Sequence, residues 1–172
     1  GTLVESAPDL LNALNHIVEP LVLEPVTLPS IRTMIGQGAK AMILAALEKN
    51  GRDPQSVDLE ALWSSFLAHY RENIAVDSYV FDGVETALAA LRQEGARLAV
   101  CTNKTQALSD QLLVALGLDD FFDSVVGSDS VSAKKPDGGH IIQTVREAGG
   151  SADRAIMVGD SRTDEKAALN AG

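Results

Sequence analysis

Side chains that suit the binding of a phosphate group follow two apolar runs of the sequence. Thr102 and Asn103 come directly after residues 98–101, and both side chains can donate hydrogen bonds to phosphate oxygens. A few residues after the next apolar run, Lys134 and Lys135 supply positive charge that offsets a phosphate dianion. Hydroxyl, amide and ammonium groups at these places predict a site for a phosphate ester.

A pair of carboxylates follows a third apolar run, residues 156–158. Asp160 comes shortly after that run, and Asp164 lies four residues further on, one turn later in a helix. Mg²⁺ binds proteins through one or two carboxylates, together with phosphate oxygens and water. The pair therefore predicts magnesium as the cofactor, with Asp160 as the direct ligand. Asp164 is predicted to complete the metal site by orienting metal-bound water or Lys135.

Alternating strands and helices position these groups in the second part of the chain. Short apolar runs predict buried strands, and apolar residues three or four positions apart predict amphipathic helices. Strands are predicted at residues 97–101, 124–127 and 154–158, and helices at residues 84–93, 105–116, 137–148 and 162–170. This alternation is typical of a parallel sheet covered by helices, in which ligands bind at the carboxyl ends of the strands. The groups above are therefore predicted to meet at one edge of the sheet.

The first part of the chain, from residue 7 to about residue 76, is predicted to be a small helical bundle. Helices are predicted at residues 9–18, 39–49 and 59–74. Ser6 is predicted to cap the first of them, and Pro8 lies in its first turn, where a missing N–H costs nothing. No convincing strand pattern interrupts these helices.

Composition excludes several classes of function. The 172 residues carry a formal net charge of −10, which argues against nucleic acids and anionic membrane surfaces as partners. The longest apolar stretch, residues 41–47, is far shorter than the roughly 20 residues that span a bilayer. Cys101 is the only cysteine and lies in an apolar run, so it is expected to be a small core residue. We expect a soluble, cytoplasmic protein.

Each candidate group also has a simpler structural explanation. Thr102 and Asn103 could cap the helix that follows them, and the two lysines could be a solvated loop pair. Asp160 and Ser161 could cap the last helix. The order of the groups, each after a strand of one sheet, favours the phosphate site. Three histidines do not cluster with these groups and are predicted to be structural or surface residues: His16, His69 and His140.

Four segments resemble the motifs of the haloacid dehalogenase-like hydrolases and, within that family, the phosphoglycolate phosphatases. Gly-Thr-Leu at residues 1–3 is similar to the end of the first motif, in which two aspartates flank one residue directly before it. Thr102 resembles the hydroxyl residue of the second motif, and Lys135, directly before Pro136, the lysine of the third. Residues 159–164 match the fourth motif, Gly-Asp-Ser-x-x-Asp. The resemblance covers the whole chain.

The resemblance implies a fold class and a division of the chain. Members of the family have an α/β core with a Rossmann-like parallel sheet, into which an α-helical cap domain is inserted. Residues 1–6 and 81–172 are accordingly expected to form the core, and residues 7–80 the cap. The strand with the two aspartates would precede Gly1, and a further strand and helix would follow Gly172. The chain is therefore expected to be a capped hydrolase trimmed at both ends.

The resemblance also implies Mg²⁺-dependent hydrolysis of a phosphomonoester through an aspartyl-phosphate intermediate. Thr102 and Asn103 would hold the phosphoryl oxygens, and Lys135 would pair with the phosphate and the nucleophile. Residues 32–38 resemble the cap segment that faces the substrate. Arg32 would meet the carboxylate of the substrate, and Gly36 would lie against it.

The substrate that the resemblance favours is 2-phosphoglycolate, hydrolysed to glycolate and phosphate. The expected partner is thus a small phosphorylated substrate, with no nucleic acid and no membrane, and the protein is expected to be a monomer or a homodimer. Two alternatives stay open: another small phosphate ester as substrate, or a catalytically silent phosphate-binding module if the chain truly begins at Gly1. A nucleotide-binding doubly wound domain fits less well, because no Gly-rich phosphate loop is present.

Overall fold

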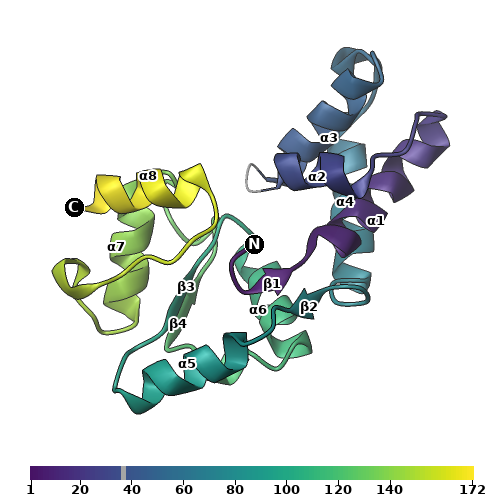
Figure 1. Ribbon diagram of the computed structural model, residues 1–172. Helices are drawn as coiled ribbons and strands as arrows, with labels where there is room; N and C mark the ends of the chain where they lie inside the picture. Colours follow the sequence, from purple (N-terminus) through teal and green to yellow (C-terminus); the bar gives the residue numbers. More distant parts are fainter. Residues whose placement is uncertain (36–37) are drawn as a thin grey trace. The chain divides into compact units, whose positions relative to one another are not determined.

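The computed structural model describes residues 1–35 and 38–172, which form two compact units (Figure 1). One unit consists of Gly1–Glu5 and Tyr79–Gly172, and the other of Ser6–Ser78. The expected division, residues 1–6 with 81–172 for the core and residues 7–80 for the cap, has its boundaries within two residues of these. The helical unit is thus an insertion near the start of the α/β unit, and the chain passes between the two at Glu5 and at Ser78.

The described residues of the helical unit form four α-helices and two short 3₁₀-helices. The α-helices are α1 (Ala7–Val18), α2 (Leu28–Met34), α3 (Ala39–Lys49) and α4 (Leu59–Glu72), and the 3₁₀-helices are η1 (Glu19–Leu21) and η2 (Pro54–Ser56). The predicted helices at 9–18, 39–49 and 59–74 are confirmed, whereas α2 was not predicted. Ser6 occupies the N-cap position of α1 but makes no side-chain capping bond, so the predicted cap interaction is wrong.

The core of the helical unit is built from the apolar faces of α1, α3 and α4. In α1, Leu10, Leu14 and Ile17 recur at helical spacing and are buried, as an amphipathic helix requires. Phe66 and Tyr70, one turn apart on α4, stack their rings in this core with centroids 6.1 Å apart. These contacts hold α1 and α4 side by side.

A buried carboxylate fastens the end of this unit to its beginning. Asp9 is 0% exposed and accepts hydrogen bonds from the backbone N–H groups of Asp77 and Ser78, and from the Ser78 hydroxyl (2.6 Å). A buried carboxylate without such donors would be strongly destabilising. Asp9 therefore fixes the segment that leaves the helical unit against the helix that enters it.

The α/β unit contains two pairs of strands. Strands β1 (Val4–Glu5) and β2 (Tyr79–Val80) are antiparallel and were not predicted. Strands β3 (Ala99–Cys101) and β4 (Ser124–Val126) are parallel, as predicted, and Cys101 lies opposite Val126. The remaining elements are α5 (Val84–Gln93), α6 (Gln106–Ala115), η3 (Asp119–Phe121), α7 (Gly138–Glu147), η4 (Ala152–Arg154) and α8 (Arg162–Ala171).

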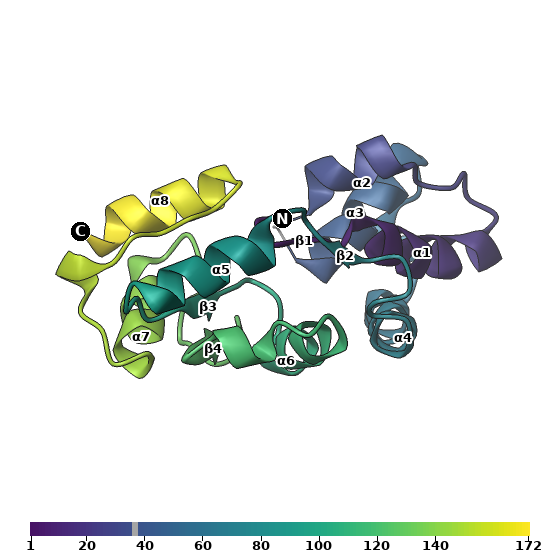
Figure 2. The ribbon, with the colours of Figure 1, turned by 60° about the horizontal axis from the view of Figure 1, so that its bottom comes forward.

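Helices cover the parallel pair. Helix α7 packs against both β3 and β4, α6 packs against β4, and α8 runs beside α7 (Figures 1 and 2). Helix α7 has a polar and an apolar face, and its buried residues include His140, Ile141 and Thr144. The parallel pair and α7 thus supply the framework for the residues that follow each strand.

The predicted strand at 154–158 is wrong in this structure. Residues 155–159 have no regular secondary structure, and Ile156 and Val158 are 90% and 71% exposed. An apolar run becomes a strand only when a neighbouring strand pairs with its backbone, and none of the described strands pairs with this segment. Within the described residues, no helix is both long and apolar enough to cross a membrane.

Candidate active site

Strands β3 and β4 bring the first group of predicted phosphate-binding residues to one edge of the pair. Both strands end at the same level because they are parallel and Cys101 lies opposite Val126. The Thr102 N–H donates to the Val126 carbonyl oxygen (3.1 Å), and the Thr102 hydroxyl oxygen accepts from the Lys104 N–H (3.1 Å). Thr102 is thereby held in a tight turn at the carboxyl end of β3.

The simpler explanation for Thr102 and Asn103, that they cap the next helix, is wrong. The N-cap position of α6 belongs to Thr105, and the Thr102 oxygen bonds within its own turn. The Asn103 side chain instead donates to the backbone carbonyl oxygen of Lys135 (2.9 Å). This bond joins the loop after β3 to the loop that carries the lysine.

Lys135 is a buried lysine, only 8% exposed. Its Nζ donates to Asp164 Oδ1 at 2.7 Å and to the Cys101 carbonyl oxygen at 2.6 Å. A buried ammonium needs such partners, since breaking a buried ion pair by removing one member costs about 3–5 kcal/mol. The neighbouring Lys134 is exposed, so the solvated-loop explanation suits Lys134 and not Lys135.

Asp164 is held by the start of α8 as well as by Lys135. Ser161 is the N-cap of α8, and a reciprocal capping box joins it to Asp164, whose Oδ2 accepts from the Ser161 hydroxyl (2.6 Å) and N–H (3.1 Å). Burial raises the pKa of Asp164, but the hydrogen bonds from Lys135 and Ser161 and the charge of Lys135 bring the pKa below its usual value. Asp164 is therefore an ionised carboxylate, with one oxygen engaged by Lys135 and the other by Ser161.

Asp160 has a different environment. It is exposed, and its Oδ1 accepts a hydrogen bond from the Thr2 hydroxyl at 2.7 Å. Gly1 lies beside the same oxygen, since a Cβ added to it would be 3.6 Å away. The residues that resemble the end of the first motif therefore meet the fourth motif at Asp160.

The carboxylates of the site differ in how well they suit a hard cation. Within residues 1–35 and 38–172, no group of three or more His, Cys, Asp or Glu side chains could hold a metal ion. Mg²⁺ does not need such a group, because it commonly binds one or two carboxylates and takes its other ligands from phosphate and water. The exposed Asp160 carboxylate fits this requirement, whereas Asp164 is engaged with Lys135 and Ser161.

The prediction that the histidines lie apart from these groups is wrong for His140. Its ring is buried, and its Nδ1 accepts a hydrogen bond from the backbone N–H of Lys135 (3.2 Å). Both partners of its ring are backbone groups, so the spacing of side chains in the sequence carried no signal for this contact. His16 and His69, in the helical unit, stack with ring centroids 4.1 Å apart, as structural or surface residues.

Two further side chains near the site titrate away from their ordinary values. Burial lowers the pKa of Lys104 to about 8. Burial also raises the pKa of the half-buried Cys101 thiol, and the weaker effects of Thr144 and Lys135 do not reverse this. A protonated thiol is a poor nucleophile, which agrees with the expectation that Cys101 is a packing residue.

The residues predicted to contact substrate from the cap belong to the helical unit or lie outside the described residues. Arg32 is exposed near the end of α2, in the helical unit. Gly36 lies outside the described residues. The cluster therefore consists of residues of the α/β unit only.

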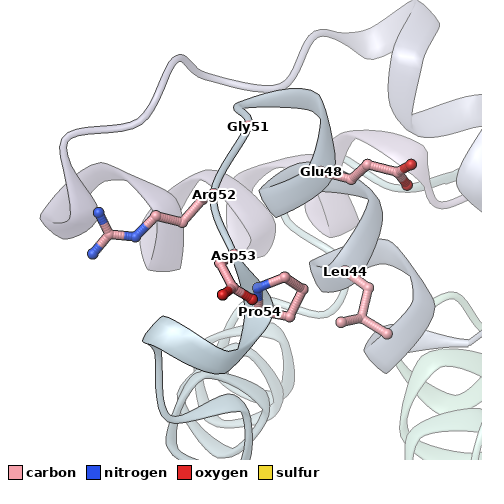
Figure 3. Close-up of a pocket in the computed structure, with 6 residues that line it drawn as sticks. All are labelled: Leu44, Glu48, Gly51, Arg52, Asp53 and Pro54. Atoms are coloured by element: carbon pink, nitrogen blue, oxygen red, sulfur yellow. The ribbon is translucent and has the colours of Figure 1, made fainter.

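A surface hollow in the helical unit lies between the end of α3 and η2 (Figure 3). In it the Asp53 side chain caps η2 by accepting from the Gln55 N–H. None of the described residues predicted to bind substrate or metal contributes to its lining, so it is assigned no part in the site. The lining residues are Leu44, Glu48, Gly51, Arg52, Asp53 and Pro54.

Comparison with known proteins gives matches along the whole chain. A family model described as haloacid dehalogenase-like hydrolase matches residues 1–172. The phosphoglycolate phosphatase of Agrobacterium fabrum (strain C58) is 42% identical over 171 residues, which are 99% of this chain and 73% of that protein. The phosphoglycolate phosphatase of Caulobacter vibrioides is also 42% identical, over 100% of this chain and 73% of its own length.

A solved structure of similar fold also matches almost the whole chain. The crystal structure of a predicted phosphoglycolate phosphatase from Haemophilus somnus 129PT matches with a TM-score of 0.90 and 28% identity, covering 99% of this chain and 78% of that one. The likeness confirms the predicted α/β fold class with an inserted helical domain. Together with the motif residues gathered around Lys135, it shows that the chain belongs to the haloacid dehalogenase-like hydrolase family.

Proposed function

We propose that the protein is a Mg²⁺-dependent phosphomonoester hydrolase and that its substrate is 2-phosphoglycolate. The observation that carries the proposal is the buried Lys135 ammonium, held by Asp164 and the Cys101 carbonyl beside the turn at Thr102. A buried cation at the carboxyl ends of parallel strands is suited to a small anion. The relatives named phosphoglycolate phosphatase supply the identity of that anion.

The donors of Lys135 and Thr102 support this role. An ammonium has three N–H donors, of which two go to Asp164 and Cys101 within the described residues, leaving one for a phosphate oxygen. The Thr102 oxygen accepts from the Lys104 N–H, so its own hydroxyl proton can be donated to a second phosphate oxygen. Asn103 supports the pair by donating to the Lys135 carbonyl oxygen, and it is proposed as a further substrate-binding residue of the same loop.

The proposed chemistry is a displacement in two steps. A carboxylate attacks phosphorus, the P–O bond to the alcohol breaks, and the alcohol leaves with a proton; water then attacks phosphorus and releases phosphate from the carboxylate. The resemblance to the family implies that the nucleophile and the proton donor are the two aspartates of the family's first motif. Lys135 would offset the repulsion between the anionic carboxylate and the anionic phosphate.

Asp160 would hold Mg²⁺, and the Thr2 hydroxyl would orient the Asp160 carboxylate. When bound, the cation supplies positive charge that polarises the phosphoryl group. Asp164 would act on Lys135 by keeping its ammonium in place. The two carboxylates of the fourth motif would thus have separate tasks, one for the metal and one for the lysine.

Recognition of the glycolate end is assigned to the helical unit. The substrate carries a carboxylate besides its phosphate, and a guanidinium binds carboxylates through two parallel hydrogen bonds. Arg32 on α2 is the proposed partner, and Gly36 is a second proposed substrate-binding residue.

The test is phosphate release by the complete protein from a panel of small phosphomonoesters that includes 2-phosphoglycolate. We expect 2-phosphoglycolate to be hydrolysed with the highest kcat/KM, activity to disappear with EDTA, and added Mg²⁺ to restore it. Faster hydrolysis of another ester overturns the substrate. Binding of inorganic phosphate without release from any ester overturns the enzyme and supports a silent phosphate-binding module.

A further inference from the structure

Both ring nitrogens of His140 are engaged in a fully buried position. Nδ1 accepts from the Lys135 N–H at 3.2 Å, and Nε2 lies 3.0 Å from the Val126 carbonyl oxygen. An N–H can only donate and a carbonyl oxygen can only accept, so both bonds form together only when the ring proton is on Nε2. The two partners therefore select one tautomer of the neutral ring.

The Val126 carbonyl is shared between two parts of the site. Besides facing His140, it accepts the Thr102 N–H at 3.1 Å. One imidazole ring thus joins the backbone of Lys135 to the carbonyl that holds Thr102. Since Lys135 Nζ donates to the Cys101 carbonyl, the lysine is tied to the strand ends both at its backbone and at its side chain.

The start of α7 gives the ring little freedom. The His140 carbonyl accepts from the Thr144 hydroxyl (2.8 Å), and the Asp137 side chain caps the helix by accepting from the Gly139 N–H. Gly138 packs directly on the backbone of α8, since a Cβ there would lie 2.4 Å from the carbonyl carbon of Asn170. Burial lowers the pKa of His140 by more than the hydrogen bond to Val126 raises it, and the charge of Lys135 lowers it further, so the ring is neutral at pH 7.

We infer that His140 is a positioning residue whose ring sets the place of Lys135 relative to Thr102. The inference rests on the function proposed above, in which Lys135 and Thr102 bind the same phosphoryl group. His140 acts through Lys135, because each ring nitrogen already has a protein partner. Loss of the bond at Nδ1 would free the lysine backbone, and the ammonium would lose its alignment with the Thr102 hydroxyl.

Two substitutions in the complete protein separate the two bonds of the ring. The short amide of His140→Asn places an oxygen near the position of Nδ1, so it can still accept from Lys135. The longer amide of His140→Gln places an NH₂ group near the position of Nε2, so it keeps only the bond to Val126. We expect His140→Gln to lower kcat for 2-phosphoglycolate about 100-fold, because a misplacement of about 1 Å can cost that much. We expect His140→Asn to recover most of that loss.

A matched control comes from the next residue of α7. Ile141 is buried in the same helix turn and is a partner in neither hydrogen bond, so we expect Ile141→Ala to lower the unfolding midpoint while leaving kcat unchanged. If His140→Asn and His140→Gln lose kcat equally at equal stability, the ring is only structural and the inference is overturned.

Nitrogen-15 NMR of the wild-type protein tests the ring without any substitution. The inference requires the proton on Nε2 and an unprotonated Nδ1, and a proton on Nδ1 overturns it. The two proposals also fail in different ways. A wild-type protein that hydrolyses no phosphomonoester refutes the proposed function, whereas an active wild type with equally impaired His140 variants refutes only the role of His140.

Discussion

Gly159, the first residue of the Gly-Asp-Ser-x-x-Asp segment, leaves the space that Asp164 occupies. A Cβ added at residue 159 would lie 2.4 Å from Cβ, 2.6 Å from Cγ and 2.8 Å from Oδ2 of Asp164. Carbon atoms in contact are about 3.5–4.0 Å apart, so Gly159→Ala requires a displacement of about 1 Å. Asp164 cannot absorb this by rotating its side chain, because Ser161 and Lys135 hold its two oxygens.

The displacement would fall on the 2.7 Å contact between Asp164 and Lys135. Overpacking of this kind typically destabilises a protein by about 1–3 kcal/mol. Because the lysine loses its alignment, we expect kcat in Gly159→Ala to fall about 100-fold, with a smaller change in KM. Steady-state phosphate release from 2-phosphoglycolate measures the first effect, and urea unfolding followed by circular dichroism measures the second.

Gly150→Ala is the matched control. Its Cβ would lie 3.1 Å from a methyl group of Val145, which needs a shift of only a few tenths of an ångström, and Gly150 is remote in sequence from the site residues. We expect this variant to keep wild-type kcat. Wild-type kcat in Gly159→Ala, with the variant folded, would refute the claim that the placement of Asp164 governs Lys135.

Three further predictions concern stability. Asp9→Ala removes the acceptor of the Ser78 N–H and hydroxyl, and of the Asp77 N–H. It should lower the free energy of unfolding in urea by about 2–4 kcal/mol. A loss under about 1 kcal/mol would contradict the role of Asp9 in fixing residues 77 and 78. Gly127→Ala would bring a Cβ to 2.3 Å from the backbone nitrogen of Gln106, so the thermal midpoint of the variant should drop by several degrees. An unchanged midpoint would show that Gly127 is not in close contact with the start of α6. The pKa of His140 lies below its value in the unfolded chain, about 6.5, so the unfolded state takes up the proton first and stability should fall as the pH drops from about 7.5 to about 5.5. Urea titrations at both pH values, compared with His140→Asn, measure this slope, and an equal slope in the two proteins would contradict the assignment.

The elements with strong periodic patterns could be predicted from the sequence. The helix at residues 39–49 corresponds to α3 without a shift in either boundary, because an apolar stripe precedes the helix-ending pair Asn50-Gly51. Helix α2 was not predicted, because its seven residues, which include Pro29, are too few to show the spacing of apolar residues that marks a helix. The two-residue strands β1 and β2 are too short to alternate visibly, and only pairing across the sequence creates them.

Some residues of the candidate site could likewise be predicted from the sequence, and others could not. The choice of Lys135 over Lys134 came from the motif pattern, and the structure supplies the physical reason, which is that only Lys135 is buried against Asp164. The part of His140 could not be predicted from spacing alone, because its bonds go to backbone groups, and backbone groups leave no mark in a sequence. The strand at 154–158 failed for a related reason, since an apolar run does not reveal whether a neighbouring strand is present to pair with it.

The most direct test of the account compares Lys135→Met with Lys134→Met in the complete protein. Methionine keeps most of the length and the apolar stem of lysine but removes the ammonium, and Lys135 and Lys134 differ in burial and in contact with Asp164. Phosphate release from 2-phosphoglycolate is the measurement, with circular dichroism to show that both variants are folded. We predict that kcat falls about 100- to 1,000-fold in Lys135→Met, as when an electrostatic donor is removed from an active site, and that Lys134→Met matches the wild type. Equal activity in the two variants would contradict the central claim that the buried lysine is the cation of the phosphoryl site.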